Sequence, residues 1–284
     1  MRKFRLLMIA SVLMISTELK TNAQAPRIPE ASSTQTIIQD FGLGKITVTY
    51  SRPNVLGRVI FGGINPYGQV WRTGANSATT ITFSESVVME GNKVPAGTYS
   101  LFSIPEKDEW TIILNKTAKQ WGAYSYKQAD DFLRFKVKPI KLDEKRESFT
   151  IQFANVTTKS SDLHLVWDHT EVSIHLETDD DAQITANIDE LMKGDPAKRP
   201  YFNAIQYYWV NNKDMKKALG WALEAQKVDP KGPWYKLWEA RVHLKMGDKP
   251  AAATAAKQGI ELAKASNDYE YVRLNQEALD QASN

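Results

Sequence analysis

The sequence predicts a mainly antiparallel β-sandwich or jelly-roll-like N-terminal domain, followed by an all-α helical-repeat C-terminal region. Three observations predict this architecture. Apolar and polar residues alternate in short runs from Ile46 to Glu177, which is typical of strands with one buried face. The alternation stops at the run Thr178–Asp181, and apolar residues then recur at helical spacing. The helical part also repeats itself at an offset of 34 residues, from Lys213 to Gly247.

The N-terminus has the pattern of a secretory signal. Met1–Arg5 is basic, Leu6–Ile15 is apolar, and a polar stretch follows. Thr21 and Ala23 are small residues at the −3 and −1 positions of a cleavage site, so we expect residues 1–23 to be removed. The apolar run has ten residues, half of the roughly 20 that span a bilayer. We therefore expect a periplasmic or extracellular protein without a membrane span after cleavage.

The charge of the expected exported chain is balanced. The whole sequence has 36 Lys and Arg against 33 Asp and Glu. Residues 1–23 contain four of the basic and one of the acidic side chains, which leaves 32 of each sign. A neutral chain has no electrostatic footprint for nucleic acid, so we expect no nucleic-acid partner. The absence of cysteine excludes disulfides, thiolate metal sites and cysteine nucleophiles, and no motif indicates a cofactor.

Nine alternating runs predict the strands of the first domain, residues 24–178. They are Ile46–Ser51, Thr80–Ser84, Val87–Met89, Thr98–Ile104, Trp110–Leu114, Leu133–Val137, Phe149–Phe153, Leu163–Trp167 and Val172–Leu176. Gly and Pro separate several of these runs, and no helical pattern intervenes. Many short strands without helices between them indicate an antiparallel sandwich or a jelly roll.

The second region, residues 179–284, is predicted to be helical throughout. The acidic side chains of Asp179–Asp181 suit a helix N-terminus, where they complement the helix dipole. Ala182–Lys193 follows as a helix, which Gly194 ends. The chain beyond is helical to its end, and Tyr269–Ala282 is expected to cap the last apolar face.

Matched positions 34 residues apart give this helical region a repeat. They are Lys213/Gly247, Asp214/Asp248, Ala218/Ala252, Trp221/Ala255 and Ala225/Gly259. The period and the small residues resemble the tetratricopeptide repeat, a helix–turn–helix unit. Only two units are visible, so an unrelated array of helical hairpins is the alternative. The aromatic residues of the region either fill the packing between its helices or line a groove for a peptide partner.

Several motifs of the β region occur in an order that resembles a known family. They are Ser51–Arg58, Ile60–Gly62, Asn65–Gly68, Val70–Asn76, Val94–Leu101, Trp110–Asn115, Trp121–Tyr124 and Leu165–Trp167. Together they resemble the bacterial family named domain of unknown function 2911, over about residues 36–177, which is common in exported proteins of the Bacteroidetes. The resemblance implies a β-rich domain in the cell envelope. It implies no reaction and no catalytic residues.

The densest polar cluster in these motifs is the candidate ligand site. Its members are Ser51, Arg52, Asn54, Arg58, Trp71, Arg72, Thr73 and Asn76. Guanidinium groups bind carboxylates or phosphates through parallel hydrogen bonds, and aromatic faces stack on sugar rings. The cluster therefore predicts a pocket for an anionic or glycan ligand. In the alternative interpretation, the arginines only fasten long loops to the sandwich through backbone carbonyls.

From these features we expect a non-catalytic binding or scaffold module, with a helical tail that contacts a protein or peptide partner. The alternative is a glycan-directed hydrolase or carbohydrate-binding protein, with a pocket near Arg52, Arg72 and Asn76. A hydrolase needs two opposed carboxyl groups. The candidates for these groups are Glu85, Asp168, Glu171 and Glu177.

The histidines of the β region suggest a metal site as a further alternative. A hairpin that brings Asp168 or His169 opposite Glu171 or His175 would place metal-binding groups together, with His164 on the same strand. No His-x-His or His-Glu-x-x-His spacing supports such a site, so we predict no metal.

Overall fold

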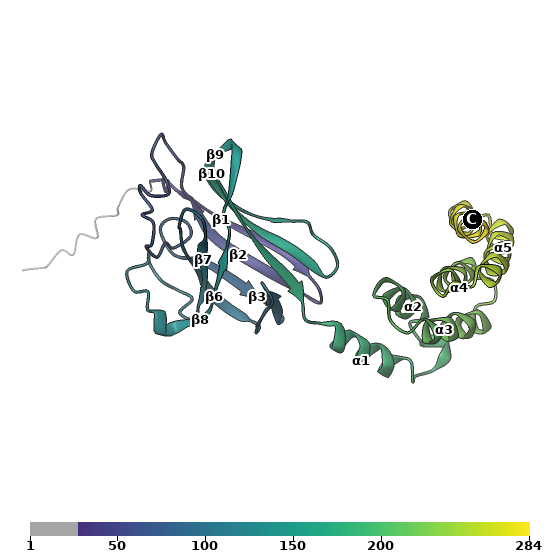
Figure 1. Cartoon of the computed structure of the whole chain (residues 1–284). Coiled ribbons are helices and arrows are strands. Elements are labelled where there is room, and N and C mark those ends of the chain that lie inside the picture. Colours follow the sequence, from purple (N-terminus) through teal and green to yellow (C-terminus); the bar gives the residue numbers. More distant parts are fainter. Residues whose placement is uncertain (1–27) are drawn as a thin grey trace, which may run out of the picture.

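The computed structural model describes residues 28–284 and consists of a β part and a helical part that meet at one short helix (Figure 1). In this described part, ten strands come first and six α-helices follow, so the predicted fold class is confirmed. The expected signal segment, residues 1–23, lies outside the described residues. None of the helices within residues 28–284 is both long enough and apolar enough to cross a lipid bilayer.

Six antiparallel strands form the first sheet, in the order β1-β2-β3-β6-β7-β8. Their bounds are β1 Ser33–Phe41, β2 Gly44–Arg52, β3 Thr79–Phe83, β6 Gly97–Ile104, β7 Trp110–Asn115 and β8 Asp131–Val137. The alternation in the sequence corresponds to alternation in burial. In β3, Thr79, Ile81 and Phe83 are buried, and the two residues between them are half-exposed.

The second sheet has the order β5-β4-β10-β9 and is also antiparallel. Its strands are β4 Val87–Met89, β5 Asn92–Val94, β9 Ile140–Ala154 and β10 Ser160–Thr178. β10 folds back on itself near Asp168, a residue with φ of 54°. The end of β10 therefore returns to its start, where the Thr178 amide donates to the Lys159 carbonyl at 2.8 Å. The strands predicted at Leu163–Trp167 and Val172–Leu176 are the two limbs of this one element.

The two sheets enclose one hydrophobic core, as a sandwich requires. An aromatic cluster fills one end of this core. Trp71, from a loop, stacks on Trp167 of β10 with ring centroids 5.7 Å apart and an interplanar angle of 18°. Phe61, Trp110 and Phe149 meet the Trp71 ring edge-on, the favoured arrangement for neighbouring aromatic rings.

Loops cover the opposite face of the first sheet. Phe102 of β6 and Ile113 of β7 are fully buried there, together with Ala78. The Tyr126 ring stands edge-on to Phe102, with centroids 5.2 Å apart. Burial of these apolar side chains anchors the loops around residues 70–78 and 118–126 on the sheet.

The sequence pattern does not reveal β1 and β5. β1 is the edge strand of the first sheet, and Phe41, its last residue, is the one residue of β1 that is buried. The inner face of β1 is only half-buried and holds Gln35 and Gln39 beside Ile37, whereas Ile38 is exposed. Apolar and polar residues therefore do not alternate in its sequence. β5 has only three residues, too few to display a period.

The helical part consists of α1 Asp181–Leu191, α2 Tyr201–Val210, α3 Met215–Val228, α4 Pro233–Lys245, α5 Lys249–Ala265 and α6 Tyr269–Ser283. Consecutive helices from α2 to α6 pack against one another. The 34-residue offset is visible in the structure. Asp214 and Asp248 accept hydrogen bonds from first-turn amides of α3 and α5. Ala218 and Ala252, one turn further on, are both fully buried.

The aromatic residues of the helical part mainly fill the packing between its helices. Tyr208, Trp221 and Trp238 are buried, and Tyr208 meets Trp221 edge-on with centroids 4.7 Å apart. Trp209 is only partly buried, but its indole nitrogen donates to the Arg241 carbonyl of α4 at 3.2 Å.

The acidic run before α1 does not cap that helix as predicted. Asp180 occupies the N-cap position, but its side chain makes no capping bond. Its Oδ2 accepts from the Leu43 amide in the β1–β2 turn at 3.1 Å. Asp179 pairs with Lys93 at 2.6 Å and accepts from Ser86 at 3.1 Å. These carboxylates therefore hold the connecting segment against the β part.

Asp181, in contrast, contacts the helical part. It accepts from the Tyr207 hydroxyl of α2 at 2.6 Å and pairs with Lys213 at 2.7 Å. Lys213, and after it Tyr207, lower the pKa of the Asp181 carboxyl below its usual value. Asp180 and Asp181 therefore lie at the N-terminus of α1, as predicted, but their side chains do not cap it. Donors on neighbouring elements, including the Leu43 amide and the Lys213 ammonium group, bind these carboxylates instead.

Candidate functional site

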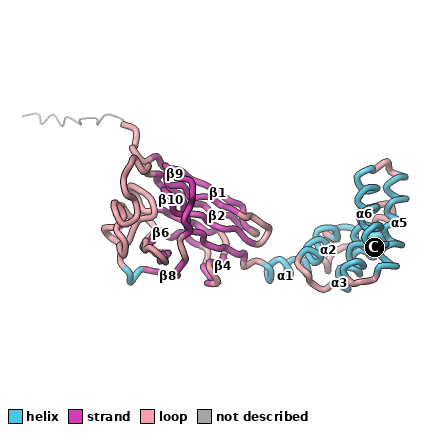
Figure 2. Tube along the Cα trace, turned by 45° about the horizontal axis from the view of Figure 1, so that its top comes forward, coloured by secondary structure: helices cyan, strands magenta, loops and turns pink. Residues whose placement is uncertain are grey.

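Most of the long loops of the β part gather at the end of the sandwich that points away from the helices (Figures 1 and 2). These loops include residues 53–78 and 116–130, which contain five of the predicted family motifs in whole or in part. The candidate site residues Asn54, Arg58, Trp71 and Arg72 lie here. The structure therefore brings together motifs that are far apart in the sequence.

Two adjoining cavities open in these loops, one of about 300 Å³ and one of about 240 Å³. They share Ile64, Asn65, Trp71 and Arg72, and we call them together the loop-end groove. The other lining residues are Ser32, Pro53, Arg58, Pro66, Gln69, Val70, Gly74, Ala75, Ala123, Tyr124 and Trp167. No acidic residue is among these lining residues.

Arg72 lies at the centre of the groove. Its Nη1 donates to the Asn76 carbonyl at 2.7 Å, and its guanidinium carbon lies 6.0 Å from the centre of the Tyr124 ring. Nε and Nη2 donate to no protein atom within residues 28–284. One edge of the guanidinium group is therefore held by the loop, and the other retains hydrogen-bond donors for a ligand.

The backbone beside Arg72 is strained in a way that fixes its position. Thr73 and Asn76 have φ of 51° and 55°, in the left-handed region that β-branched residues in particular avoid. Thr73 is fully buried, its hydroxyl lies 2.9 Å from that of Ser103, and its carbonyl accepts from Thr79 at 2.5 Å. These bonds hold the strained loop and orient Arg72 before any ligand arrives.

Asn65 and Arg58 add further donors. The Asn65 side-chain nitrogen is a buried atom without a hydrogen-bond partner among the described residues. Arg58 is exposed and is held by its own loop, since it donates to the carbonyls of Val55 at 3.0 Å and Asn54 at 2.5 Å. Both residues line the groove, which makes its polar surface rich in donors.

Exposed apolar side chains border the groove. Tyr124 is 83% exposed, Trp121 is 64% exposed and Ile64 is 46% exposed. Ile64 and Tyr124 line the groove directly. The backbone of Trp121 pairs with Ser77, and the next residue, Gly122, donates its amide to the Asn76 carbonyl at 3.0 Å, which also accepts from Arg72. Trp121 and Tyr124 were not among the predicted site residues. The signal that could have identified them is their shared family motif, Trp121–Tyr124.

Of the eight predicted site residues, Arg58, Trp71 and Arg72 line the groove, and the other five lie outside it. Arg52 fastens the two sheets together, because it donates to the Phe149 carbonyl at 3.1 Å and to the Thr150 hydroxyl at 3.0 Å. The two sequence-based interpretations of the arginines therefore apply to different residues.

The remaining four, Ser51, Asn54, Thr73 and Asn76, brace the loops. Asn54 accepts from the Ser148 hydroxyl at 2.5 Å, which ties its loop to β9. The Asn76 side-chain nitrogen donates to the Ser32 carbonyl at 3.2 Å and lies 3.5 Å from the Ser51 hydroxyl. These residues do not line the groove but hold the loops that form it.

The carboxylates proposed for a hydrolase lie elsewhere. Glu85, Asp168, Glu171 and Glu177 do not line the groove. Glu171 lies 3.4 Å from His164 on the outer face of the second sheet. In residues 28–284, no group of three or more His, Cys, Asp or Glu side chains is placed to hold a metal ion. Without a carboxylate pair the groove lacks the groups that glycoside hydrolysis requires.

His175 and Asp162 pair across the two limbs of β10, with Nδ1 and Oδ1 2.7 Å apart. The bond to Asp162, followed by a weaker one to Glu177, raises the pKa of His175. Asn155, followed by His175, lowers the pKa of Asp162. Both shifts stabilise the folded β part while His175 is charged and Asp162 is ionised.

We expect His175→Gln to reduce the thermal stability of the protein at pH 6 more than at pH 8. The histidine contributes fully below its unfolded pKa of about 6.5 and loses its contribution as the pH rises through the higher folded pKa. Asp162 contributes above about pH 4, so the pair is most effective between about pH 4 and 6.5. Melting temperatures of both proteins measured from pH 6 to pH 8 test the expectation. A difference that does not change with pH would contradict it.

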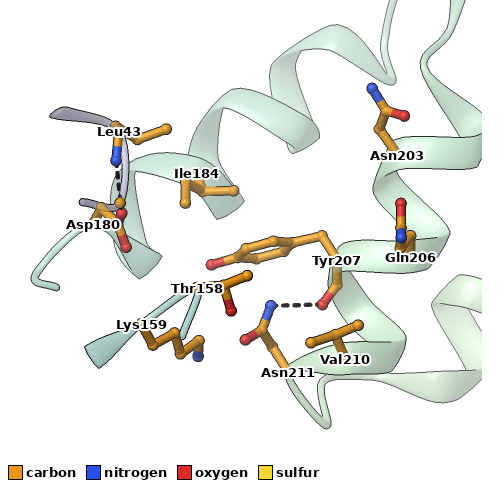
Figure 3. A pocket seen from close by; sticks show the side chains of 11 residues that line it. Leu43, Thr158, Lys159, Asp180, Ile184, Asn203, Gln206, Tyr207, Val210 and Asn211 are labelled. Atoms are coloured by element: carbon orange, nitrogen blue, oxygen red, sulfur yellow. Dashed lines mark hydrogen bonds between the residues drawn. The ribbon is translucent and has the colours of Figure 1, made fainter. Parts of the chain in front are cut away.

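A larger cleft of about 380 Å³ lies where the β part meets the helices (Figure 3). The turns at Leu43 and Lys159 form one side, and α2 forms the other with Asn203 and Gln206. The Tyr207 ring lies between them. The described residues that line this cleft include no buried polar atom without a partner. The loop-end groove does include one, so it is the stronger candidate for a ligand site.

Comparison with known proteins agrees with the motifs at the loop end. A family model described as "Protein of unknown function (DUF2911)" matches residues 32–176, which is just over half of the chain. The match covers the β part up to the second limb of β10 and does not include the helices. No curated protein and no solved structure matches the chain. The chain therefore belongs to the DUF2911 family.

Proposed function

We propose that this protein is an exported, non-catalytic binding protein that holds a ligand in the loop-end groove. The observation that carries the proposal is the composition of that groove. Arg72 and Asn65 present donors without protein acceptors, exposed rings lie beside them, and no carboxylate lines the walls. Such a site can bind and orient a ligand, but it has no acid or base for hydrolysis.

The helical tail is proposed to contact another protein. Its support is a set of large apolar side chains that remain exposed on the helices, including Leu223, Val228 and Tyr269. Tyr269 is 79% exposed at the start of α6. The double variant Leu223→Glu/Tyr269→Glu should no longer bind a partner at this surface, and ligand binding by the β part should stay unchanged. Partner binding that survives both changes would contradict this assignment.

The proposal for the groove is tested by incubating the purified protein with a glycan library and scoring both retention and the release of reducing ends. We expect retention without release. A Trp121→Ala/Tyr124→Ala variant should lose retention and keep its melting temperature, because both side chains are exposed. Trp234→Ala in the helical part is the matched control and should retain the ligand.

Product release would contradict the non-catalytic assignment. The carboxylate to examine in that case is Glu106, which lines a neighbouring cavity of about 340 Å³ together with His169. If Glu106→Gln abolishes the release of reducing ends, the protein is a hydrolase and not a binding protein. No retention of any glycan by the native protein would refute the proposal.

A further inference from the structure

We propose that the loop-end groove selects acidic saccharides, with Arg72 and Asn65 binding an acid group that is attached directly to a sugar ring. This inference rests on the proposed function and names its ligand class. Its starting point is an imbalance between donors and acceptors. The Asn65 side-chain nitrogen is buried without an acceptor, and two of the three Arg72 nitrogens are unused within the described residues. An unpaired buried donor destabilises the protein, and a ligand oxygen that accepts from it removes this cost.

The sign of the ligand's charge follows from the side chains that surround these donors. Arg58 and Arg72 are the charged residues of the groove, and both are cationic. A neutral sugar would satisfy some donors but would leave the two charges without a counterion. A carboxylate accepts two parallel hydrogen bonds from one guanidinium edge, which is the edge that Arg72 leaves free.

The position of the acid relative to a ring follows from the aromatic residues. The Arg72 guanidinium lies 6.0 Å from the centre of the Tyr124 ring, and Tyr124 is 83% exposed. The C–H face of a sugar can pack on this ring because the face of an aromatic ring carries partial negative charge. A ligand that contacts both the Arg72 guanidinium and the Tyr124 ring needs an acid group within a few ångströms of its sugar ring. A uronic acid meets this requirement, whereas a neutral hexose does not.

The experiment compares binding of uronic-acid oligosaccharides, neutral oligosaccharides of equal length, and inorganic sulfate by isothermal titration calorimetry. We expect the uronic-acid ligand to bind most tightly and its affinity to fall as salt is added. Arg72→Gln should weaken this binding by about 10- to 100-fold, the loss expected for charge-assisted hydrogen bonds. Arg58→Gln provides a second variant and should weaken binding by a smaller factor.

Arg52→Gln is the matched control, because Arg52 belongs to the same sequence motif as Arg58 but fastens β9 instead of lining the groove. We expect it to lower the melting temperature and leave affinity unchanged. Equal binding of neutral and acidic oligosaccharides, or unchanged affinity in Arg72→Gln, would overturn the inference and leave the proposed function standing. Sulfate that binds as tightly as the saccharide would also overturn it. Binding of none of the three would refute the inference, whereas the proposed function would be refuted only if the native protein also retained no member of the glycan library.

Discussion

Trp71→Ala should destabilise the β part by about 3–5 kcal/mol, the largest effect that we expect from a single substitution. Trp71 is 7% exposed, stacks on Trp167 and is enclosed by three further rings. Its indole nitrogen also donates to the Gly74 carbonyl at 3.0 Å. The substitution removes these contacts and leaves a cavity that opens into the loop-end groove, so relaxation of the surrounding rings cannot close it.

Urea unfolding monitored by circular dichroism measures this loss. Trp121→Ala provides the matched control, since the same residue type is removed from a neighbouring loop where it is 64% exposed. We expect that variant to differ from the native protein by less than about 0.5 kcal/mol. Similar losses in the two variants would show that Trp71 does not organise the aromatic end of the core.

Gly259→Ala should destabilise the helical part, although alanine is the better helix former. A Cβ at position 259 would lie 2.1 Å from Oδ1, 2.5 Å from Cγ and 2.9 Å from Nδ2 of Asn275. Asn275 is fully buried in α6, and its Nδ2 donates to the Tyr271 carbonyl at 2.8 Å, so its side chain has no free space to enter. The overpacking cost of up to about 3 kcal/mol exceeds the gain of about 1 kcal/mol in helix propensity.

Gly220→Ala separates propensity from packing. Gly220 lies inside α3, and a Cβ there would meet no atom within 4 Å. We expect Gly220→Ala to raise the thermal stability by about 0.5–1 kcal/mol and Gly259→Ala to lower it by roughly 1–2 kcal/mol. Thermal unfolding followed at 222 nm compares the two. Stabilisation by both substitutions would contradict the close approach of α5 and α6.

The fold could be predicted from the sequence where one face of an element is buried. Residues such as Ile81 and Thr82 alternate in the sequence because they alternate between the core and the outside of β3. β1 escaped prediction because it is an edge strand with little buried surface. The role of Asp179–Asp181 also escaped prediction, since their partners are set by how the two parts meet and not by the local sequence.

The candidate site could be predicted only in part. The sequence indicates that arginines and aromatic residues cluster, but it does not indicate which way each side chain points. Arg52 lies on a regular strand, and its side chain reaches β9. Arg72 lies in a loop, and the next residue, Thr73, has a left-handed backbone conformation. Tyr124 joins Arg72 only because its loop folds over the outer face of the first sheet.

The most direct test of the proposed binding site is a titration of the isotopically labelled protein with a uronic-acid oligosaccharide, monitored through the eight tryptophan indole N–H signals in nuclear magnetic resonance spectra. We expect the indole signals of both Trp121 and Trp71 to shift. Trp71 lines the groove, and Trp121 lies in the loop beside it. The signals of Trp209, Trp234 and Trp238 in the helical part should remain in place. Shifts confined to those helical signals, or no shift at a ligand concentration that saturates binding, would contradict the account.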